Sequence, residues 1–352
     1  MNKIMDANIY VKQFVFLLSI FVSYHLIVWT FFTAQIFEPK TGTGVGDLGR
    51  MSYQIDLLHN RQTKYTLTKK HLHSRNFKNQ HIDIITIGDS FSNGGGGGDN
   101  PFYQDHLATN LDKNVLNIAP SHSKTSLQTI VGLYNSGYLA KLKPEAIIVE
   151  SVQRIIPHRY NKEIDFSIKI DKPTISVKPT ETYMQPINII NTANYKIPYY
   201  YVKYRYKTNA QKNVHRFRLN KKLFSVKNGK NILLLNDDIK NLNQFTQAGV
   251  EKVNANFNRV ATLLKTIDIK LYFLPAIDKY DLYYNYIIQD KYPKNLFFEL
   301  IRPLHKEYYF IDTKEILSAL LDAGVEDIYF IDDTHWSQKA SSAISKSQVF
   351  KD

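Results

Sequence analysis

The sequence predicts an α/β protein built on a mostly parallel central sheet. Short apolar runs alternate with helical patterns over 81–157 and again over 245–352, as in βαβ units. Between these two parts, 158–244 breaks the alternation and is expected to form an inserted cap region. An apolar stretch near the amino terminus adds one predicted transmembrane helix.

The amino-terminal stretch 13–37 contains no Asp, Glu, Lys or Arg. At ~1.5 Å rise per residue, a helix of this length exceeds the roughly 30 Å hydrocarbon core of a bilayer. Trp29, Phe31 and Phe32 lie toward its far end, where an aromatic belt is expected. A cleaved signal peptide is the alternative, but its apolar region should span only about 7–15 residues. We therefore expect 1–37 to be an uncleaved anchor, with the rest of the chain outside the cytoplasm.

The segment 38–80 is expected to be a stalk or lead-in, because it begins with proline and glycines and continues with many basic residues. His71 and His73 could suggest a metal site, but no carboxylate cluster lies nearby in the sequence. A solvated basic face near anionic headgroups is the favoured interpretation.

The first predicted strand, 82–87, ends abruptly in Gly88-Asp89-Ser90. The carboxyl end of a buried parallel strand faces the ligand crevice, and a serine on a tight turn there can carry a catalytic hydroxyl. The alternative is that Ser90 is only the N-cap of a following helix. The glycine run 94–98 lacks the Gly-Lys-Ser/Thr ending of a P-loop, so we expect a flexible loop that lets a substrate approach.

The remaining elements continue the same alternation. Further strands are expected at 114–119, 146–150, 270–275 and 308–311, and helices at 101–111, 125–142, 250–264 and 312–323. Within the cap, the tract Tyr195–Lys222 is rich in Lys, Arg and Tyr and contains no Asp or Glu. Such a tract can stack on and pair with a polyanion, or it can be an amphipathic hairpin whose tyrosines pack inward.

The chain has 352 residues and a formal net charge of +13, which suits nucleic acid, an anionic membrane surface or an acidic glycan as a partner. The predicted anchor makes nucleic acid the less favoured polyanion, and no nucleic-acid partner is expected. The chain has no cysteine, which excludes disulfides, thiolate catalysis and cysteine-ligated zinc.

A second polar strand end follows at Tyr329–Ser337, where Asp332, Asp333, Thr334 and His335 stand together. An Asp two or three residues before a His can hold the imidazole tautomer, so that the free Nε2 deprotonates a serine hydroxyl. A metal fragment or a helix cap is the alternative. Because one His has no obvious companion set of ligands, no metal site is predicted.

These two motifs together resemble the SGNH (GDSL-type) hydrolases: Gly88-Asp89-Ser90 early in the chain and Asp-Asp-Thr-His ending at His335. The Asp-Thr-His-Trp stretch 333–336 is similar to the SGNH-like O-acetyltransferases that modify alginate and related bacterial exopolysaccharides. Looser likenesses lie at 150–154 and 275–280. The resemblance covers about 81–155 and 245–347, but not the middle of the chain.

The resemblance implies a three-layer α/β/α domain in which Ser90 is the nucleophile and His335 the base. The acetyltransferase-like group places the acid two residues before the histidine, at Asp333, whereas general SGNH enzymes place it at Asp332. We favour Asp333, because Thr334-His335-Trp336 also matches the acetyltransferase-like group. No cofactor is implied.

The chain departs from the SGNH pattern at the oxyanion hole. The glycine block expected after the second strand is absent, as is the Gly-x-Asn-Asp block expected after the third. The remaining candidates for oxyanion or substrate contacts are Asn117, Ser121, Gln153, Arg154, Lys279 and Trp336. An α/β-hydrolase is a further alternative, but its nucleophile elbow would need glycine in place of Ser92.

The leading hypothesis is a membrane-anchored O-acyltransferase, most simply an O-acetyltransferase, acting on a cell-surface or exported polysaccharide. The resemblance implies a bacterial cell membrane and an acyl donor supplied by a multi-pass membrane acyltransferase partner. An SGNH carbohydrate esterase or deacetylase with the same three residues is the second hypothesis. An inactive SGNH-like scaffold that binds glycan is the third.

Overall fold

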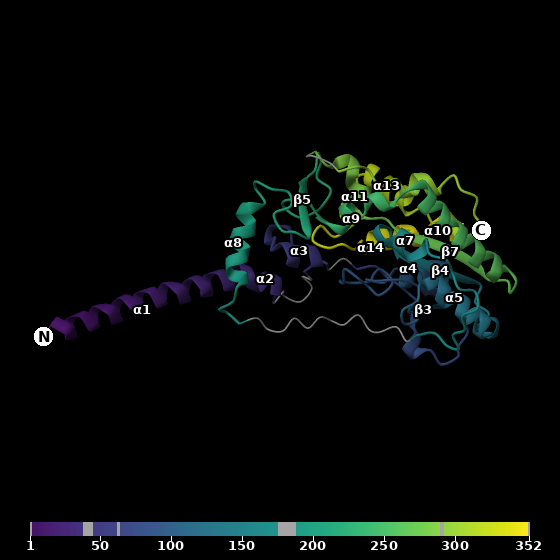
Figure 1. Cartoon of the computed structure of the whole chain (residues 1–352), viewed down its shortest axis with the longest axis horizontal. Helices are drawn as coiled ribbons and strands as arrows, with labels where there is room; N and C mark the ends of the chain where they lie inside the picture. The colour runs from purple at the N-terminus through teal and green to yellow at the C-terminus, as the bar shows by residue number, and fades with distance from the viewer. Residues whose placement is uncertain (1, 38–44, 62–63, 175–187, 289–291, 351–352) are drawn as a thin grey trace.

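The computed structural model describes residues 2–37, 45–61, 64–174, 188–288 and 292–350. One long helix at the amino terminus projects away from an α/β domain that holds the carboxyl-terminal part of the chain (Figure 1). The prediction of an α/β protein with a mostly parallel central sheet is confirmed.

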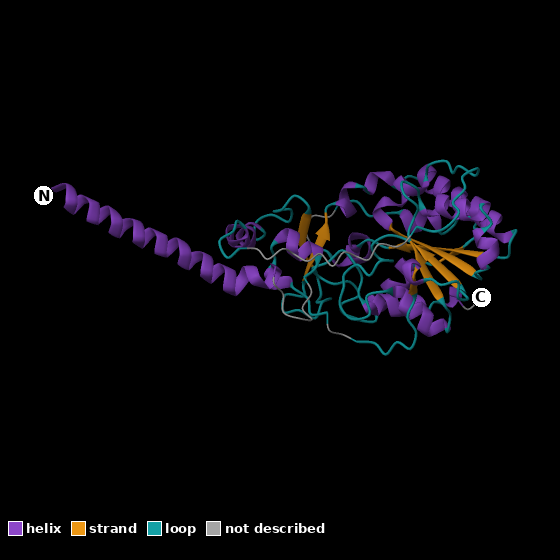
Figure 2. Ribbon diagram, turned by 90° about the horizontal axis from the view of Figure 1, so that it is seen from below, coloured by secondary structure: helices purple, strands orange, loops and turns teal. Residues whose placement is uncertain are grey.

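Six parallel strands form the central sheet in the order β1-β3-β2-β4-β7-β8. Their bounds are β1 (Leu72–His73), β2 (Ile84–Ile87), β3 (Val115–Ile118), β4 (Ala146–Val152), β7 (Lys270–Ala276) and β8 (Tyr309–Phe310). Every residue of β2, β3 and β4 is buried. These strands are therefore apolar in near-continuous runs, as expected when helices cover both faces of a sheet. Figure 2 shows the strands fanning out between helices on either side.

The helices of the domain form two groups. One group is α4 (Tyr103–Leu111), α13 (Thr313–Asp322) and α14 (Gln338–Ser345); the other is α5 (Ser126–Asn135), α6 (Tyr138–Leu142), α7 (Ile156–Tyr160), α10 (Gln247–Lys265) and α12 (Phe297–Ile301). Helix α11 (Lys279–Tyr283) follows β7 directly. In α10 the predicted apolar stripe Val250, Val253, Phe257, Val260 and Leu264 is fully buried. The Thr246 hydroxyl caps this helix by accepting from the Gly249 N–H.

The middle of the chain contributes a two-stranded antiparallel sheet, β5 (Val214–Arg218) and β6 (Asn231–Leu235), with helices α8 (Ala193–Lys203) and α9 (Asp237–Lys240). The hairpin lies between α8 and the central sheet (Figures 1 and 2). Phe217 and Leu233 on its strands are buried in the same apolar core as the sheet. Part of the expected cap region, 175–187, lies outside the described residues.

The amino-terminal helix comprises α1 (Asn2–Val28), a π-helical stretch η1 (Trp29–Thr33) and α2 (Ala34–Phe37). From Ala7 to Phe37 it is long and apolar enough to cross a membrane. Most of α1 touches no other part of the described chain, whereas its far end meets α8 (Figure 1).

The segment that leads into the domain is folded over 45–61. It forms α3 (Asp47–Ser52) and a short 3₁₀ turn η2 (Ile55–Leu57), and both Leu48 and Leu57 are fully buried. Farther along, His71 is also buried, and its Nδ1 lies 2.6 Å from Asp105 Oδ1. The expectation that this histidine lies on a solvated basic face is therefore wrong, because its side chain is buried against Asp105 of α4.

Candidate active site

Ser90 lies on the turn that follows β2, at the carboxyl edge of the sheet. The Ser92 N–H donates to the Asp89 carbonyl at 3.1 Å and the Asn93 N–H donates to the Ser90 carbonyl at 3.2 Å, which closes the turn. The Ser90 side chain is exposed. Ser90 is not the N-cap of a helix, because the next helix, α4, begins only at Tyr103.

His335 stands beside this serine and is held by the adjacent acidic segment. Its Nε2 lies 2.7 Å from Ser90 Oγ, and its Nδ1 lies 2.6 Å from Asp333 Oδ1. The His335 backbone N–H donates to the same Asp333 oxygen at 3.0 Å. A carboxylate only accepts hydrogen bonds, so Nδ1 carries the proton and Nε2 is left to accept from the serine hydroxyl. This is the geometry in which a histidine can deprotonate a serine.

The charges of this pair support one another. Burial alone would lower the pKa of His335, but the Asp333 charge and hydrogen bond outweigh it, and the net pKa is raised above 6.5. Burial alone would raise the pKa of Asp333, yet the charge of His335 and its hydrogen bonds, with Arg61, hold that pKa well below its usual range. Asp333 therefore stays ionised at neutral pH and favours the imidazolium that forms after proton transfer.

Asp332 has a different set of partners. Its carboxylate is completely buried and forms a two-pronged ion pair with Arg61, at 2.7 Å from Nη2 and 3.2 Å from Nη1. The Gly46 N–H donates to Asp332 Oδ2 at 3.0 Å. Of the two candidate acids, the structure places Asp333 on the imidazole and Asp332 on the arginine.

Asp47, from the lead-in segment, is a site residue that the sequence did not reveal. Its carboxylate accepts from the Thr334 N–H at 2.8 Å and from the Thr334 hydroxyl at 2.6 Å. Thr334 is thereby fixed between Asp333 and His335. No local signal marks Asp47, because it meets Thr334 from the opposite end of the chain.

Asp47, Asp333 and His335 each offer a ligand atom within 4.8 Å of the other two. Such a group could hold a cation. However, both Asp47 oxygens accept hydrogen bonds from Thr334, and Asp333 accepts one from the imidazole. Hydrogen bonds to Thr334 and to the imidazole therefore account for the close approach of these three side chains.

The glycine run packs against the imidazole. A Cβ on Gly95 would lie 2.3 Å from Cδ2 and Nε2 of His335, closer than real Cβ contacts, and a Cβ on Gly96 would meet Cβ of His335 at 3.1 Å. The Gly95 N–H also donates to the Ser90 carbonyl at 2.7 Å. The expected flexible loop is thus a packed one, and Gly95 is required because no side chain fits there.

Two polar residues inside the sheet, Glu150 and Asn117, support the turn that carries Ser90. Glu150 Oε2 accepts from the Asp89 N–H at 2.9 Å and from the Ser92 hydroxyl at 2.8 Å. Burial, followed by the charge of Asp89, raises the pKa of Glu150 well above 4.5. Asn117 donates to the Ser92 carbonyl at 2.9 Å. Asn117 is fully buried, so it positions the turn and does not face a substrate.

Comparison with protein-family models gives no match to this chain, and comparison with curated proteins gives none either.

Three further oxyanion candidates form their hydrogen bonds and ion pairs with other residues. The Gln153 side chain donates to Asp281 at 2.8 Å and accepts from the Asp278 N–H at 2.8 Å. Arg154 bridges Asp238 and Asp278, at 3.2 and 2.9 Å. Ser121 Oγ accepts from Thr174 at 3.3 Å. Within the described chain, none of these three side chains contacts Ser90 or His335. The Ser90 backbone N–H itself donates to no other described residue and so can act as an oxyanion donor.

Lys279 and Trp336 are buried rather than exposed to substrate. The Lys279 ammonium donates to the backbone carbonyls of Phe330, Ile331 and Asp333 at 2.9–3.1 Å. Burial lowers its pKa to about 8. Trp336 packs edge-on against Phe91, with ring centroids 4.6 Å apart. Lys279 thus holds the backbone that carries the acid, and Trp336 belongs to the core beside the imidazole.

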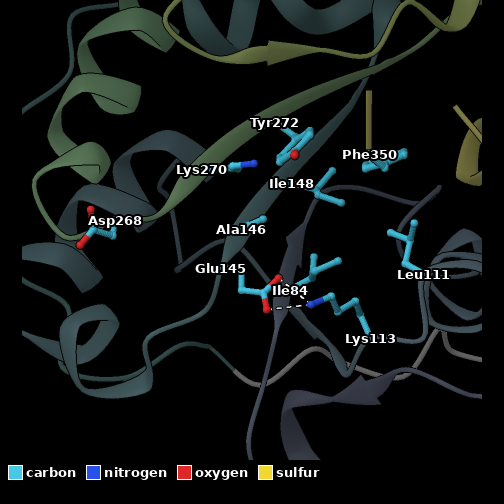
Figure 3. A pocket seen from close by; sticks show the side chains of 10 residues that line it. All are labelled: Ile84, Leu111, Lys113, Glu145, Ala146, Ile148, Asp268, Lys270, Tyr272 and Phe350. Atoms are coloured by element: carbon cyan, nitrogen blue, oxygen red, sulfur yellow. Dashed lines mark hydrogen bonds and ion pairs between the residues drawn. The ribbon is translucent and has the colours of Figure 1, made fainter. Parts of the chain in front are cut away.

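A pocket of about 450 Å³ lies at the opposite end of the sheet (Figure 3). It is lined by the first residues of three strands, Ile84, Ala146 and Lys270, and by the Lys113–Glu145 ion pair. Ligands of open α/β sheets bind at the carboxyl ends of the strands. This pocket is therefore separate from the Ser90 site.

Proposed function

We propose that this chain is a membrane-anchored serine O-acyltransferase, most simply an O-acetyltransferase, that modifies a cell-surface or exported polysaccharide. The observation that carries the proposal is the Ser90 Oγ to His335 Nε2 distance of 2.7 Å, with Asp333 on the other ring nitrogen at 2.6 Å. The intact hydrogen-bonded set favours an enzyme over an inactive scaffold. The likeness to SGNH-type O-acetyltransferases, at the serine and histidine motifs, supports the same choice.

The proposed reaction has two half-steps. His335 Nε2 takes the hydroxyl proton of Ser90 while Oγ attacks the carbonyl carbon of an acyl donor, and the imidazolium then returns that proton to the leaving group. A sugar hydroxyl next gives its proton to His335 and attacks the acyl-serine, which releases the ester and restores the serine. Because Ser90 is exposed, a polymeric acceptor can reach it.

The long apolar helix from Ala7 to Phe37 supports anchoring in a membrane. In the proposed orientation the domain lies on the extracytoplasmic side, in a bacterial cell membrane. Acetyl-CoA is not expected there, so a multi-pass membrane acyltransferase would deliver the acyl group. The proposed acceptor is the polysaccharide, and no cofactor or nucleic acid takes part.

A carbohydrate esterase is the second candidate, and the exposure of Ser90 favours it specifically, since water reaches the acyl-serine as easily as a sugar hydroxyl does. One assay distinguishes the transferase activity from the esterase activity. Full-length protein in detergent is given an activated acetyl ester with or without an oligosaccharide. Acetylated oligosaccharide supports the transferase, whereas acetate released equally in both cases supports the esterase.

The test of the proposal itself is Ser90→Ala in cells that make the polysaccharide. We expect its acyl content to fall to background while the protein's abundance is unchanged. Ser225→Ala is the matched control, because Ser225 is exposed and far along the chain, and its hydroxyl makes no hydrogen bond within the described residues. Unchanged acyl content and unchanged ester hydrolysis in Ser90→Ala would overturn the proposal.

A further inference from the structure

Helix α8 is fixed to the far end of the candidate membrane helix by a buried polar cluster. The Asn194 side chain accepts from the Thr33 hydroxyl at 2.6 Å and lies 2.6 Å from His25 Nδ1. The Tyr24 hydroxyl donates to the Asn194 carbonyl at 2.8 Å, and the Tyr24 and Tyr195 rings stack. His25, Thr33 and Asn194 are all buried. The cluster therefore fixes the position of α8 along the amino-terminal helix, next to residues 24–33.

That position coincides with the place where the helix would leave the bilayer. About 20 residues cross the hydrocarbon core. Counted from Gln13, the first residue of the stretch without Asp, Glu, Lys or Arg, they end close to Phe32. Lys12 lies just before this stretch, where its long side chain can reach the headgroups. α8 contacts the helix between Tyr24 and Thr33, so it meets the span close to the boundary between hydrocarbon and headgroups.

The axis of α8 also has the orientation expected of a helix that lies on a membrane surface. It runs across the axis of α1 and not along it, whereas the α/β domain lies farther out on the side away from α1 (Figure 1). If α1 crosses a bilayer, α8 lies close to the membrane plane. Helices of this kind bury an apolar face at the headgroup boundary.

The side chains of α8 and its flanks suit that position. Large apolar and aromatic side chains exposed here are Ile189, Ile190, Tyr199, Tyr201, Val202 and Tyr206. Basic side chains are interleaved with them: Lys196, Lys203, Arg205 and Lys207. Tyrosines are enriched at membrane interfaces, and lysine and arginine place their charges among the headgroups while their stems cover apolar surface.

A basic pocket of about 320 Å³ lies between α8 and the β5–β6 hairpin. Its lining residues are Asp56, Tyr201, Tyr204, Arg205, Arg216, Arg218, Asn228 and Asn231. Asp56 is paired with Arg216 at 2.8 Å, and the described lining residues together carry three guanidinium groups and one carboxylate. Tyr201 on α8 and Arg205 just after it line the pocket and are both exposed, so the pocket opens beside the helix.

We propose that α8 is an interfacial helix and that the pocket beside it binds the phosphate of an anionic phospholipid headgroup. This inference rests on the proposed membrane anchoring, not on the acyl-transfer chemistry. The basic, tyrosine-rich tract expected to bind a polyanion thus faces the bilayer, and lipid phosphate is the polyanion it meets. Arginine binds phosphate through paired N–H groups, and three arginines, Arg205, Arg216 and Arg218, line this pocket.

The first test measures depth in the membrane. Because the chain has no cysteine, single cysteines at Val202, Leu17 and Lys252 can each carry an environment-sensitive fluorophore on the full chain in phosphatidylglycerol-containing nanodiscs. We expect headgroup nitroxides to quench the label at Val202, and deep acyl-chain nitroxides to quench the label at Leu17. Lys252, exposed on α10, is the control that neither should quench.

The outcomes separate this inference from the anchor. A Val202 label that behaves like the one at Lys252, with a quenched label at Leu17, overturns the interfacial helix and leaves the anchor intact. If the label at Leu17 is also in water, the anchor fails as well. Neither result bears on the Ser90 chemistry.

The second test measures lipid preference. Native mass spectrometry of the full chain in detergent compares bound phosphatidylglycerol with phosphatidylcholine. We expect a preference for phosphatidylglycerol that falls about tenfold in Arg205→Gln/Arg218→Gln, since each basic residue near an anionic headgroup contributes to binding. Lys141→Gln/Lys252→Gln is the matched control, because it removes the same charge from exposed positions on the α/β domain. Equal binding of the two lipids, or displacement of phosphatidylglycerol by an acidic oligosaccharide, would overturn the assignment.

Discussion

Asp332 and Asp333 are neighbours in the sequence, but their carboxylates have different main partners. Asp333 lies 2.6 Å from His335 Nδ1, whereas Asp332 lies 2.7 Å from the Arg61 guanidinium. The two residues lie on a turn, in which the Asp333 N–H donates to the Phe330 carbonyl at 3.3 Å. Oδ1 of Asp333 is directed to the imidazole, whereas both oxygens of Asp332 meet Arg61 of the segment that precedes the domain.

Asp333→Asn should reduce activity far more than it reduces stability. The amide cannot hold the imidazole in the tautomer that leaves Nε2 free, and loss of this role costs up to about 10⁴-fold in turnover. The rate at which a fluorophosphonate labels Ser90 measures the effect without a known substrate. Asp332→Asn is the comparison: its main effect should be a lower melting temperature. A larger loss of labelling in Asp332→Asn than in Asp333→Asn would contradict the assignment.

The labelling rate should also depend on pH with a midpoint above 6.5. Only neutral His335 can act as the base, and its pKa is raised because the Asp333 charge outweighs the effect of burial. The rate should therefore rise with pH through that raised pKa. In Asp333→Asn burial acts without the opposing charge, so the midpoint should move to lower pH. Identical pH profiles for the two proteins would count against the coupling.

Arg61→Leu should destabilise the domain strongly. It leaves the Asp332 carboxylate buried without its counter-ion, which costs about 3–5 kcal/mol for a buried pair. The same change removes the hydrogen bond from Arg61 Nε to the Gly96 carbonyl, at 2.8 Å. Circular dichroism melting of the full-length protein measures the loss. Asp332→Asn added to Arg61→Leu should recover part of it, and a double variant less stable than Arg61→Leu would contradict this account.

The sheet and the pairing of Ser90 with His335 could be predicted from local patterns. β2 is a short, mostly apolar run, and Ser90 follows it at the carboxyl edge of the sheet. The expected strand before His335 is wrong, because 329–336 form a turn closed by the Tyr329–Trp336 bridge, and this turn brings His335 to Ser90. The choice between Asp332 and Asp333 could not be made from spacing, because either separation from the histidine is compatible with a hydrogen bond.

Asp47 and Arg61 could not be predicted for another reason. Each meets the acidic segment from the opposite end of the chain, and such a pairing leaves no periodicity or motif in the sequence. β1 was missed because a strand of two residues, Leu72–His73, carries no alternation. The glycine run was interpreted as flexible, since composition does not reveal that His335 occupies the space beside Gly95.

Gly95→Ala should reduce Ser90 labelling by about 100-fold, the effect expected when a reacting group is displaced by ~1 Å. The added methyl would overlap the imidazole, because a Cβ there lies 2.3 Å from its Nε2. Gly97→Asn is the matched control: nothing lies within 4 Å of a Cβ at Gly97, and asparagine tolerates its φ of +62°. Equal labelling rates in the two variants would show that the loop does not constrain the imidazole.

Glu150→Gln should become more stable relative to the wild-type protein as the pH rises. Burial raises the pKa of Glu150 well above 4.5, so the folded state binds a proton that the unfolded state has released. Stability conferred by a raised pKa is present below the unfolded value and is lost as pH rises toward the folded one. Glutamine resembles the protonated acid and keeps an oxygen for the Asp89 N–H and the Ser92 hydroxyl. Melting temperatures at pH 5 and pH 8 provide the measurement.

The control for this prediction is Glu145→Gln, which removes the partly exposed pair with Lys113. Exposed pairs contribute about 0–1 kcal/mol, so its melting temperature should stay close to that of the wild-type protein at both pH values. A wild-type protein that gains stability over Glu150→Gln between pH 5 and pH 8 would mean that Glu150 is ionised in the folded state. The Ser90 turn would then rest on a buried carboxylate charge. Arg159, which pairs with Asp89 at 2.6 Å, would have to neutralise Glu150 as well.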